Sequence, residues 1–269
     1  MATLVVANTK GGVGKSIIST MVLPVLFVDE YKEVNVYEID DNNKTSSNLK
    51  NKNIDNLNFK SIKIEDMEED IDKVKLDEFT NAPDILNIID CGGGNDTIAI
   101  VKHLAKSDLY NLTYIVPTNE DLEQFTNLKD TIALIKNNDA TANIVLILNR
   151  AKSLSKNDVQ KQFINLYGSN QYGIDERFSE IESDVNSTFV VKDSHLYGIV
   201  KNVYKRTLAD MYPEFKELID NSREHQQKWA NEGKEYFMQM MKFYRVGKDV
   251  IELVEELKPL KKEIKNDES

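Results

Sequence analysis

The sequence predicts an α/β fold, in which a doubly wound, mostly parallel sheet is flanked by helices on both faces. Three observations support this prediction. Short apolar runs, typical of strands buried on both faces, begin at Thr3, Val34, Asp84, Leu112 and Asn143. Segments of helical period separate these runs, as right-handed crossovers between parallel strands require. A glycine-rich turn follows the first run and leads into a helix, which is the usual context of a phosphate-binding loop.

The first elements are a strand over Thr3–Ala7 and the loop Lys10–Ser16, whose sequence is KGGVGKS. Its glycines let the backbone wrap closely around a phosphate chain. The loop amides and the N-terminus of a predicted helix over Ile17–Val28 offer positive partial charge to the anion. We expect Lys15 to reach the β- and γ-phosphates of a nucleotide, and the hydroxyl of Ser16 to ligate Mg²⁺.

A second lysine, Lys10, opens this loop directly before two glycines. The stretch therefore resembles the deviant Walker A motif of the ParA/MinD family of P-loop ATPases, and most of all the ParA-type plasmid partition ATPases. The resemblance implies ATP and Mg²⁺ as cofactors, and a homodimer in which Lys10 reaches the nucleotide of the second subunit. It implies catalytic roles for Lys10 and Lys15. The nucleotide-binding residues that it implies are Lys10, Gly11, Gly12, Val13, Gly14, Lys15, Ser16 and Ile17.

The second predicted strand, Val34–Asp40, ends in two acids that alternate with Ile39, so both carboxylates point the same way. The resemblance implies that Asp40 orients the attacking water or helps to hold the metal shell. The sequence departs from the family here, because Glu38 replaces the first Asp of Asp-x-Asp and Asp41-Asn42 replaces Pro-Gln. The alternative is a pair of solvated acids at a strand end.

An edge strand over Leu57–Ile64 and a helix over Glu65–Glu78 follow. In the helix, Met67, Ile71 and Val74 lie at helical spacing, which predicts one buried stripe and a solvated acidic face. This segment has eight acids and two lysines, so it carries a large part of the chain's net charge of −11. A globally acidic chain is not expected to bind nucleic acid tightly.

The third strong strand, Asp84–Asp90, ends in an acid and is followed by Cys91 and three glycines. This pattern predicts a Walker B aspartate, so we expect Asp90 to bind Mg²⁺ through a water. The glycines permit movement of a loop that senses the γ-phosphate. We expect Cys91 to be a small packing residue rather than a nucleophile, because no base lies near it in the sequence.

A helix over Asp96–Ser107, a strand over Leu112–Pro117 and a helix over Glu120–Asn137 come next. We expect the apolar stripe of the last helix in the core, and it consists of Leu122, Phe125, Leu128, Ile132 and Ile135. The strand Asn143–Leu148 then ends in Asn149-Arg150. The family resemblance implies that both lie beside the adenine, with the Asn149 amide on the base edge. A surface ion pair is the alternative for Arg150.

After a helix over Ser155–Tyr167 and a last strand over Ser187–Lys192, the chain is predicted to be mainly helical. Two basic clusters stand out there. Lys201, Lys205 and Arg206 are predicted to share about one helical face, whereas a slanted stripe consists of Lys242, Arg245 and Lys248. In a dimer these clusters are a candidate surface for non-specific DNA. Solvated lysines balanced by nearby acids are the alternative.

Length and composition set the class of protein. We expect a single domain over residues 1–269, with residues 200–269 as a mainly helical extension. No apolar run approaches the ~20 residues that span a bilayer, so a membrane is not expected as a partner. A strand that begins at Thr3 leaves no room for a signal peptide. The single cysteine fits a cytoplasmic protein and excludes a disulfide framework.

Two classes of function remain open on the sequence. The first is a ParA-type ATPase that dimerises with ATP and segregates or positions plasmid DNA or another cargo, helped by a centromere-binding or adaptor protein. A related protein of conjugative DNA transfer belongs to the same class. The second is a metabolic enzyme that uses ATP to activate a small substrate. Lys10 favours the first class, and the lack of an Asn-Lys-x-Asp guanine signature favours ATP over GTP.

Overall fold

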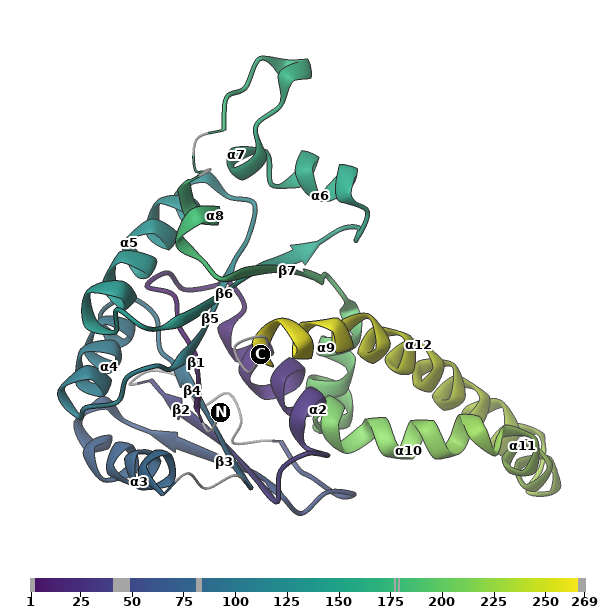
Figure 1. Cartoon of the computed structure of the whole chain (residues 1–269). Coiled ribbons are helices and arrows are strands. Elements are labelled where there is room, and N and C mark those ends of the chain that lie inside the picture. The colour runs from purple at the N-terminus through teal and green to yellow at the C-terminus, as the bar shows by residue number, and fades with distance from the viewer. Residues whose placement is uncertain (1–2, 41–48, 81–83, 177, 179, 266–269) are drawn as a thin grey trace.

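The computed structural model of the chain describes residues 3–40, 49–80, 84–176, 178 and 180–265. Within these ranges, seven strands form one sheet in the order β3-β2-β4-β1-β5-β6-β7 (Figure 1). Every neighbouring pair is parallel, so the predicted parallel sheet is confirmed. The strands are β1 Thr3–Val6, β2 Glu33–Ile39, β3 Leu57–Ile62, β4 Ile85–Cys91, β5 Thr113–Thr118, β6 Asn143–Ala151 and β7 Ser187–Lys192.

Helices cover both faces of this sheet (Figure 1). One face carries α1 Lys15–Ile17, η1 Ile18–Val22, α2 Leu23–Phe27, α9 His195–Gly198, η4 Ile199–Tyr204, α10 Leu208–Asp220, α11 Ser222–Asn231 and α12 Lys234–Lys265. The other carries η2 Ile64–Asp66, α3 Glu68–Phe79, α4 Asn95–Lys106, α5 Leu122–Asn138, α6 Lys156–Gln162, α7 Ile164–Tyr167 and α8 Glu180–Asp184. The short helix η3 Asn170–Tyr172 lies between α7 and α8 in the chain and has no buried residue.

The side-chain period of the strands divides the core into two layers. In β1, Val6 packs with the helices of the first face, whereas Val5 packs with those of the second. Both side chains are fully buried, as parallel strands covered on both faces require. The sheet therefore has the two-sided burial that its continuous apolar runs predict.

Two local predictions are wrong in detail. Leu122 belongs to the predicted apolar stripe of α5, but it is 46% exposed because it lies in the first turn of the helix, beyond the edge of the core. The predicted helix over Ser155–Tyr167 is interrupted at Phe163, whose ψ of 44° lies outside the helical range. Phe163 itself is fully buried, so tertiary packing overrides helical continuity at this point.

The helix after the glycine-rich loop is continuous from α1 to α2, but its middle turn, η1, is a π-helix. Pro24 accounts for this wider turn. A proline has no N–H to offer the carbonyl of Thr20, and its ring clashes with that carbonyl in a regular α-helix. Such π-helical turns are rare, and they occur frequently at functional sites.

The C-terminal helices form an arm that projects from the sheet (Figure 1). The C-terminal part of α12 packs on the sheet face, and α11 lies at the far end of the arm. Gly247 lets α10 and α12 approach closely, because a Cβ there would lie 2.6 Å from the ring of Phe215. Although α12 has 32 residues, no helix in the described part of the chain is long and apolar enough to cross a membrane.

A buried ionic cluster fastens the segment before β3 to α10. Asp210 is fully buried and accepts hydrogen bonds from the backbone amides of Lys52 (2.7 Å) and Asn53 (2.5 Å). Arg206 is also buried, and it donates to Asp210 and, at 2.6 Å, to Glu214. We therefore expect this pair to position the segment from residue 49 to 56 beside the arm.

We predict that Asp210→Asn lowers the free energy of unfolding by about 3 kcal/mol, because Arg206 then stays buried without its main counter-charge. The matched control is Glu214→Gln. The side chain of Glu214 is 38% exposed, so its loss should cost less than about 1 kcal/mol. Urea unfolding of both variants measures the difference. Equal losses would contradict the assignment of Asp210 as the centre of this cluster.

Candidate nucleotide-binding site

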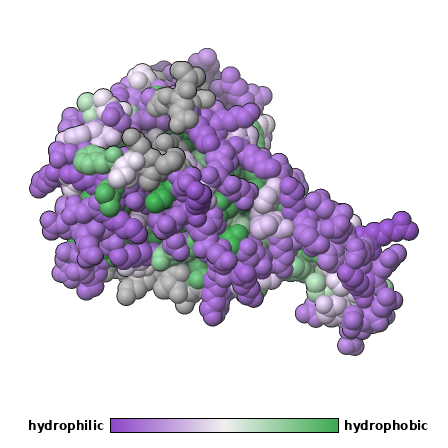
Figure 2. All heavy atoms as spheres, turned by 60° about the horizontal axis from the view of Figure 1, so that its bottom comes forward, coloured by the Kyte–Doolittle hydropathy of each residue, from purple (hydrophilic) through white to green (hydrophobic). Residues whose placement is uncertain are grey.

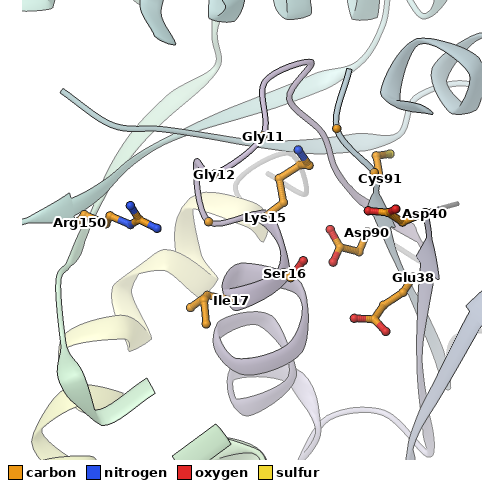
Figure 3. Close-up of a pocket in the computed structure, with 13 residues that line it drawn as sticks. Gly11, Gly12, Lys15, Ser16, Ile17, Glu38, Asp40, Asp90, Cys91 and Arg150 are labelled. Carbon is orange, nitrogen blue, oxygen red and sulfur yellow. The ribbon is translucent and has the colours of Figure 1, made fainter. Parts of the chain in front are cut away.

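A cavity of about 230 Å³ lies at the carboxyl ends of β1, β2 and β4 (Figure 3). Ligands of doubly wound sheets bind at this edge. It is lined by Gly11, Gly12, Gly14, Lys15, Ser16, Ile17, Glu38, Asp40, Asp90, Cys91, Gly92, Gly93 and Arg150. The structure thus brings the glycine-rich loop, both acidic strand ends and the second glycine loop to one place. Of the residues predicted to bind nucleotide or metal, Lys10, Val13 and Asn149 do not line the cavity.

Lys15 is the first residue of α1, and its side chain turns back into the loop. Its side chain is almost fully buried, and Nζ donates to the backbone carbonyls of Asn8 at 2.9 Å and Lys10 at 3.0 Å. Burial lowers the pKa of Lys15, and the nearby carboxylate of Asp90 acts most strongly in the opposite direction. The ammonium is therefore preorganised inside the loop, and phosphate oxygens would be stronger acceptors for it than these carbonyls.

Hydrogen bonds to distant elements fix the two residues that precede the loop. Asn8 donates through Nδ2 to the carbonyl of Pro117 at 2.8 Å and accepts the amide of Lys10 at 2.8 Å. Thr9 is tied to α5, since its amide donates to Oγ1 of Thr131 at 3.1 Å. Gly14, which has φ +101°, is in the left-handed region that favours glycine.

Asn149 contacts the backbone of the loop but does not line the cavity. It is buried, and its Nδ2 donates to the carbonyl of Val13 at 2.7 Å. A Cβ on Gly14 would lie 2.1 Å from the same nitrogen, so this glycine is required for the contact. The amide nitrogen is thus committed to the loop, and the adenine contact stays a prediction for its oxygen.

Arg150 follows at a β-bulge between β6 and β7, where its own φ is +59°. The bulge turns its exposed side chain out of the strand, and Arg150 lines the cavity on the loop side opposite the acids (Figure 3). Among the ion pairs of the described residues, none involves Arg150.

Three acids face the first turn of the loop helix (Figure 3). Asp90, at the end of β4, is buried, and its Oδ2 accepts a hydrogen bond from the hydroxyl of Ser19 at 2.8 Å. Glu38 is also buried and accepts from the hydroxyl of Ser61 at 3.1 Å. Asp40 follows β2 and is only partly buried. The other departure from the family pattern, Asp41-Asn42, lies outside the described residues.

Burial raises the pKa of Asp90 to about 7, and the charge of Glu38 adds to this effect. The hydroxyls of Ser19 and Ser16 and the ammonium of Lys15 act in the opposite direction. The neighbouring thiol of Cys91 is buried as well, which raises its pKa. Cys91 is therefore a packing residue with little thiolate character, as its surroundings in the sequence predict.

The residues present fit a magnesium ion. Oδ1 of Asp90 is buried and has no hydrogen-bond partner among the described residues, and Ser16 and Asp40 line the same cavity. Mg²⁺ prefers oxygen ligands and keeps several waters, so it is commonly bound by one or two carboxylates plus substrate phosphates. In the described part of the chain, no group of three or more His, Cys, Asp or Glu could hold a metal ion. Phosphate oxygens of a bound nucleotide and waters would add further oxygen ligands.

A pH-dependent stability follows from Asp90. Its folded pKa lies above that of an unfolded Asp, so its contribution to stability is fully present below pH ~4 and is lost as the pH rises through about 7. We predict that Asp90→Asn stabilises the nucleotide-free chain by about 2–4 kcal/mol at pH 8 and by much less at pH 5. Thermal unfolding at both pH values measures this. A gain that does not depend on pH would contradict it.

Lys10 lies outside its own cavity. Its Nζ donates to the carboxylate of Glu123, in the first turn of α5, at 2.5 Å. The Lys10 side chain is 36% exposed and that of Glu123 is 73% exposed, so the ion pair is held at the surface. Within one chain, therefore, Lys15 and not Lys10 is placed to meet a phosphate.

The predicted basic face of Lys201, Lys205 and Arg206 does not form. Arg206 is buried in the ion pair with Asp210, and Lys205 ends η4 in a left-handed conformation. Lys201 is half-buried, and burial lowers its pKa, while the carboxylates of Glu38 and Asp90 act against this shift. Lys201 thus belongs to the surroundings of the acids rather than to an outer surface.

The second basic cluster does persist. Lys242, Arg245 and Lys248 are all exposed on α12, and none of them is in an ion pair among the described residues. Lys248 lies over the ring of Tyr244, with 5.0 Å from Nζ to the ring centroid. The surface of the arm is mostly hydrophilic on the face that Figure 2 shows.

Ser19, Thr131 and Glu123 are among the residues around the site that were not predicted from the sequence. Ser19 has a local signal, because it lies three residues after Ser16 and so on the same side of the helix. Thr131 and Glu123 have none. Both come from α5, more than 100 residues after the loop that they contact, and only the fold brings them there.

Nearly the whole chain is similar to one known protein family. Residues 4–267 match the model of the CobQ/CobB/MinD/ParA nucleotide-binding domain. No curated protein matches the chain. Among solved structures, apo McdA from Cyanthece is 16% identical, with a TM-score of 0.47 and coverage of 76% of this chain and 90% of that one.

Two further structures are similar at the same level. For the MinD cell division protein of Aquifex aeolicus, the identity is 18% and the TM-score 0.42, with 61% of this chain and 78% of that chain covered. For a ParA family ATPase from Chlorobium tepidum TLS, the values are 12% and 0.41, with 94% and 97% covered. Because the family model spans nearly the whole sequence, the chain belongs to the CobQ/CobB/MinD/ParA nucleotide-binding family.

Proposed function

We propose that the protein is a Mg²⁺-dependent ATPase that dimerises with ATP and uses this switch to position a cargo. The observation that carries the proposal is the buried side chain of Lys15, which lines the same cavity as the glycines of the loop and the carboxylate of Asp90. Membership of the family supports nucleotide binding.

The cavity matches the phosphate end of a nucleotide. At about 230 Å³ it is smaller than the ~300–1,000 Å³ typical of pockets for drug-sized ligands. A triphosphate would occupy the space between Gly11 and Ser16, and the base would lie outside, toward Arg150. Mg²⁺ bound there would neutralise charge on the phosphate oxygens. Ser16 and Asp90 would hold it, and Asp40 would orient the attacking water.

The position of Lys10 supports a dimer. Lys10 does not line the cavity of its own chain, and its ammonium forms an ion pair with the exposed carboxylate of Glu123. A second chain facing the first across the two loops would bring each Lys10 toward the nucleotide of the other. The lysine would then stabilise transition-state charge in the way an arginine finger does.

Asp40→Ala tests the chemistry. We expect the variant to bind ATP with nearly unchanged affinity but to hydrolyse it at least about 100-fold more slowly, because the acid acts on the water and not on the phosphates. Equilibrium binding of a fluorescent ATP analogue and release of inorganic phosphate are measured separately. Normal turnover by Asp40→Ala would remove this residue from the mechanism.

The cargo is a finer part of the proposal, with plasmid DNA as the first candidate and a centromere-binding or adaptor protein as its partner. The exposed stripe of Lys242, Arg245 and Lys248 favours direct contact with DNA. If DNA is bound, binding should require ATP and weaken with salt, with a log–log slope of about 0.9 per phosphate contact.

The DNA test uses random duplexes, titrated with ATP and with ADP at several salt concentrations. Reversing the charge of all three stripe residues should weaken binding equally for unrelated sequences, because phosphate contacts carry no sequence information. Glu224 and Lys228 pair with each other on α11, so exchanging this pair is a matched control on the same arm. If ATP gives no binding even at low salt, the cargo is not DNA. A metabolic substrate, the alternative, would instead be required for ATP turnover.

A further inference from the structure

We propose that Ser19 is the positioning residue for Asp90, fixing which carboxylate oxygen faces the metal position. The inference rests on the proposed function, because it assumes that Mg²⁺ binds with the nucleotide. It deepens that proposal by adding a residue outside the glycine-rich loop. The two carboxylate oxygens of Asp90 have different surroundings.

The two oxygens of Asp90 differ in their contact with the helix that follows the loop. Oδ2 accepts from the hydroxyl of Ser19 at 2.8 Å, whereas Oδ1 is buried and has no hydrogen-bond partner among the residues that the structure describes. The hydroxyl of Ser16, from the cavity side, also favours the charged form of Asp90 and so lowers its pKa. Ser19 is fully buried and does not line the cavity, while Asp90 does. The side chain of Asp90 therefore lies between the helix behind it and the cavity in front of it. With Oδ2 held by the helix, Oδ1 is the oxygen that remains for a ligand.

Leaving a buried carboxylate oxygen without a partner costs free energy. The fold accepts this cost at Oδ1 of Asp90, although the hydroxyl of Ser19 satisfies Oδ2. A metal-bound water or the ion itself would satisfy Oδ1. The pairing of one held oxygen with one open oxygen is the arrangement that fixes a carboxylate for metal binding, where second-shell hydrogen bonds set its direction.

The helix is shaped for this contact. Ser19 is the second residue of η1, the π-helical turn that precedes Pro24. Its neighbour Thr20, also fully buried, turns its hydroxyl back to the carbonyl of Ser16 within the helix. Two adjacent hydroxyls in one turn thus have different partners. Thr20 donates to a backbone carbonyl of its own helix, whereas Ser19 donates to a side chain of β4. This contrast gives a matched control.

The test compares Ser19→Ala with Thr20→Val, each of which deletes one buried hydroxyl from the same turn. Affinity for a fluorescent ATP analogue is measured with excess Mg²⁺ and with EDTA. The Mg²⁺-dependent gain in affinity is the quantity of interest. Thermal unfolding of each variant, with and without Mg²⁺ and nucleotide, gives a second readout that does not depend on turnover.

We expect Ser19→Ala to bind nucleotide normally in EDTA, and to need about 10–100-fold more Mg²⁺ for half of the gain. Thr20→Val should keep the Mg²⁺ requirement of the wild type, and Ser19→Thr, which retains a hydroxyl, should restore most of it. An unchanged requirement in Ser19→Ala would overturn the inference and leave the proposed function intact. An equal shift in both deletion variants would also overturn it, because a general loosening of the helix would then suffice. If the wild type itself shows no Mg²⁺-dependent gain, the proposed function fails and the inference fails with it.

Discussion

Lys15→Met is expected to weaken binding of ATP by at least about 100-fold, because it removes the charged hydrogen-bond donor at the centre of the phosphate cradle. Methionine keeps most of the length and volume of the side chain, so the loop is not emptied. Calorimetric or fluorescence titration with ATP and Mg²⁺ measures the loss. The carbonyls of Asn8 and Lys10, which Lys15 now satisfies, would lose their donor, so thermal unfolding is recorded in parallel.

Lys102→Met on α4 is the matched control for this prediction, since Lys102 is exposed and lies outside the cavity. It should leave both affinity and stability near those of the wild type. A folded Lys15→Met protein that binds ATP as tightly as the wild type would contradict the placement of the phosphates in this cavity.

Lys10→Ala is expected to lower ATP turnover by about 10³-fold or more, the range over which a cation supplied by a second subunit acts in phosphoryl transfer. Binding of ATP to the single chain should change little, because Lys10 does not line its own cavity. Measuring affinity and phosphate release separately therefore separates the role of Lys10 from that of Lys15.

Glu123→Gln is the companion variant. It removes the ion pair that holds Lys10 within one chain but leaves the lysine itself in place. Turnover should stay at the wild-type level or rise, because Lys10 is then no longer held against α5 of its own chain. A loss of turnover equal to that of Lys10→Ala would show that the ion pair, and not a lysine acting on a second subunit, is what the reaction needs.

Much of the fold could be predicted because its signals are local. Strands that are buried on both faces appear as continuous apolar runs, and their observed ends lie within about two residues of the prediction at β2, β4 and β5. The β6 strand extends further, to Ala151, because the bulge at Arg150 lets pairing resume after Asn149. Tertiary packing decided what periodicity could not, such as the break at Phe163 and the exposure of Leu122.

In the site, too, the residues with local sequence signals could be predicted, whereas those that depend on tertiary contacts could not. The phosphate cradle lies within seven consecutive residues, so its sequence alone indicates it. The acids at Asp40 and Asp90 were predictable because parallel strands end at one edge of the sheet. Asn149 was placed near the nucleotide by resemblance, but the contact that the structure shows, with the carbonyl of Val13, depends on how β6 lies against the loop. The burial of Arg206 depends likewise on Asp210, whose role as a partner no spacing rule indicates.

We propose that ATP, and not ADP, joins two chains across their loops. Light scattering of the wild-type protein with Mg²⁺ and either nucleotide tests it most directly. We predict a mass near the 30.8 kDa of one chain with ADP and about twice that with ATP. A mass that stays at one chain with saturating ATP, under conditions where binding is verified, would contradict the account.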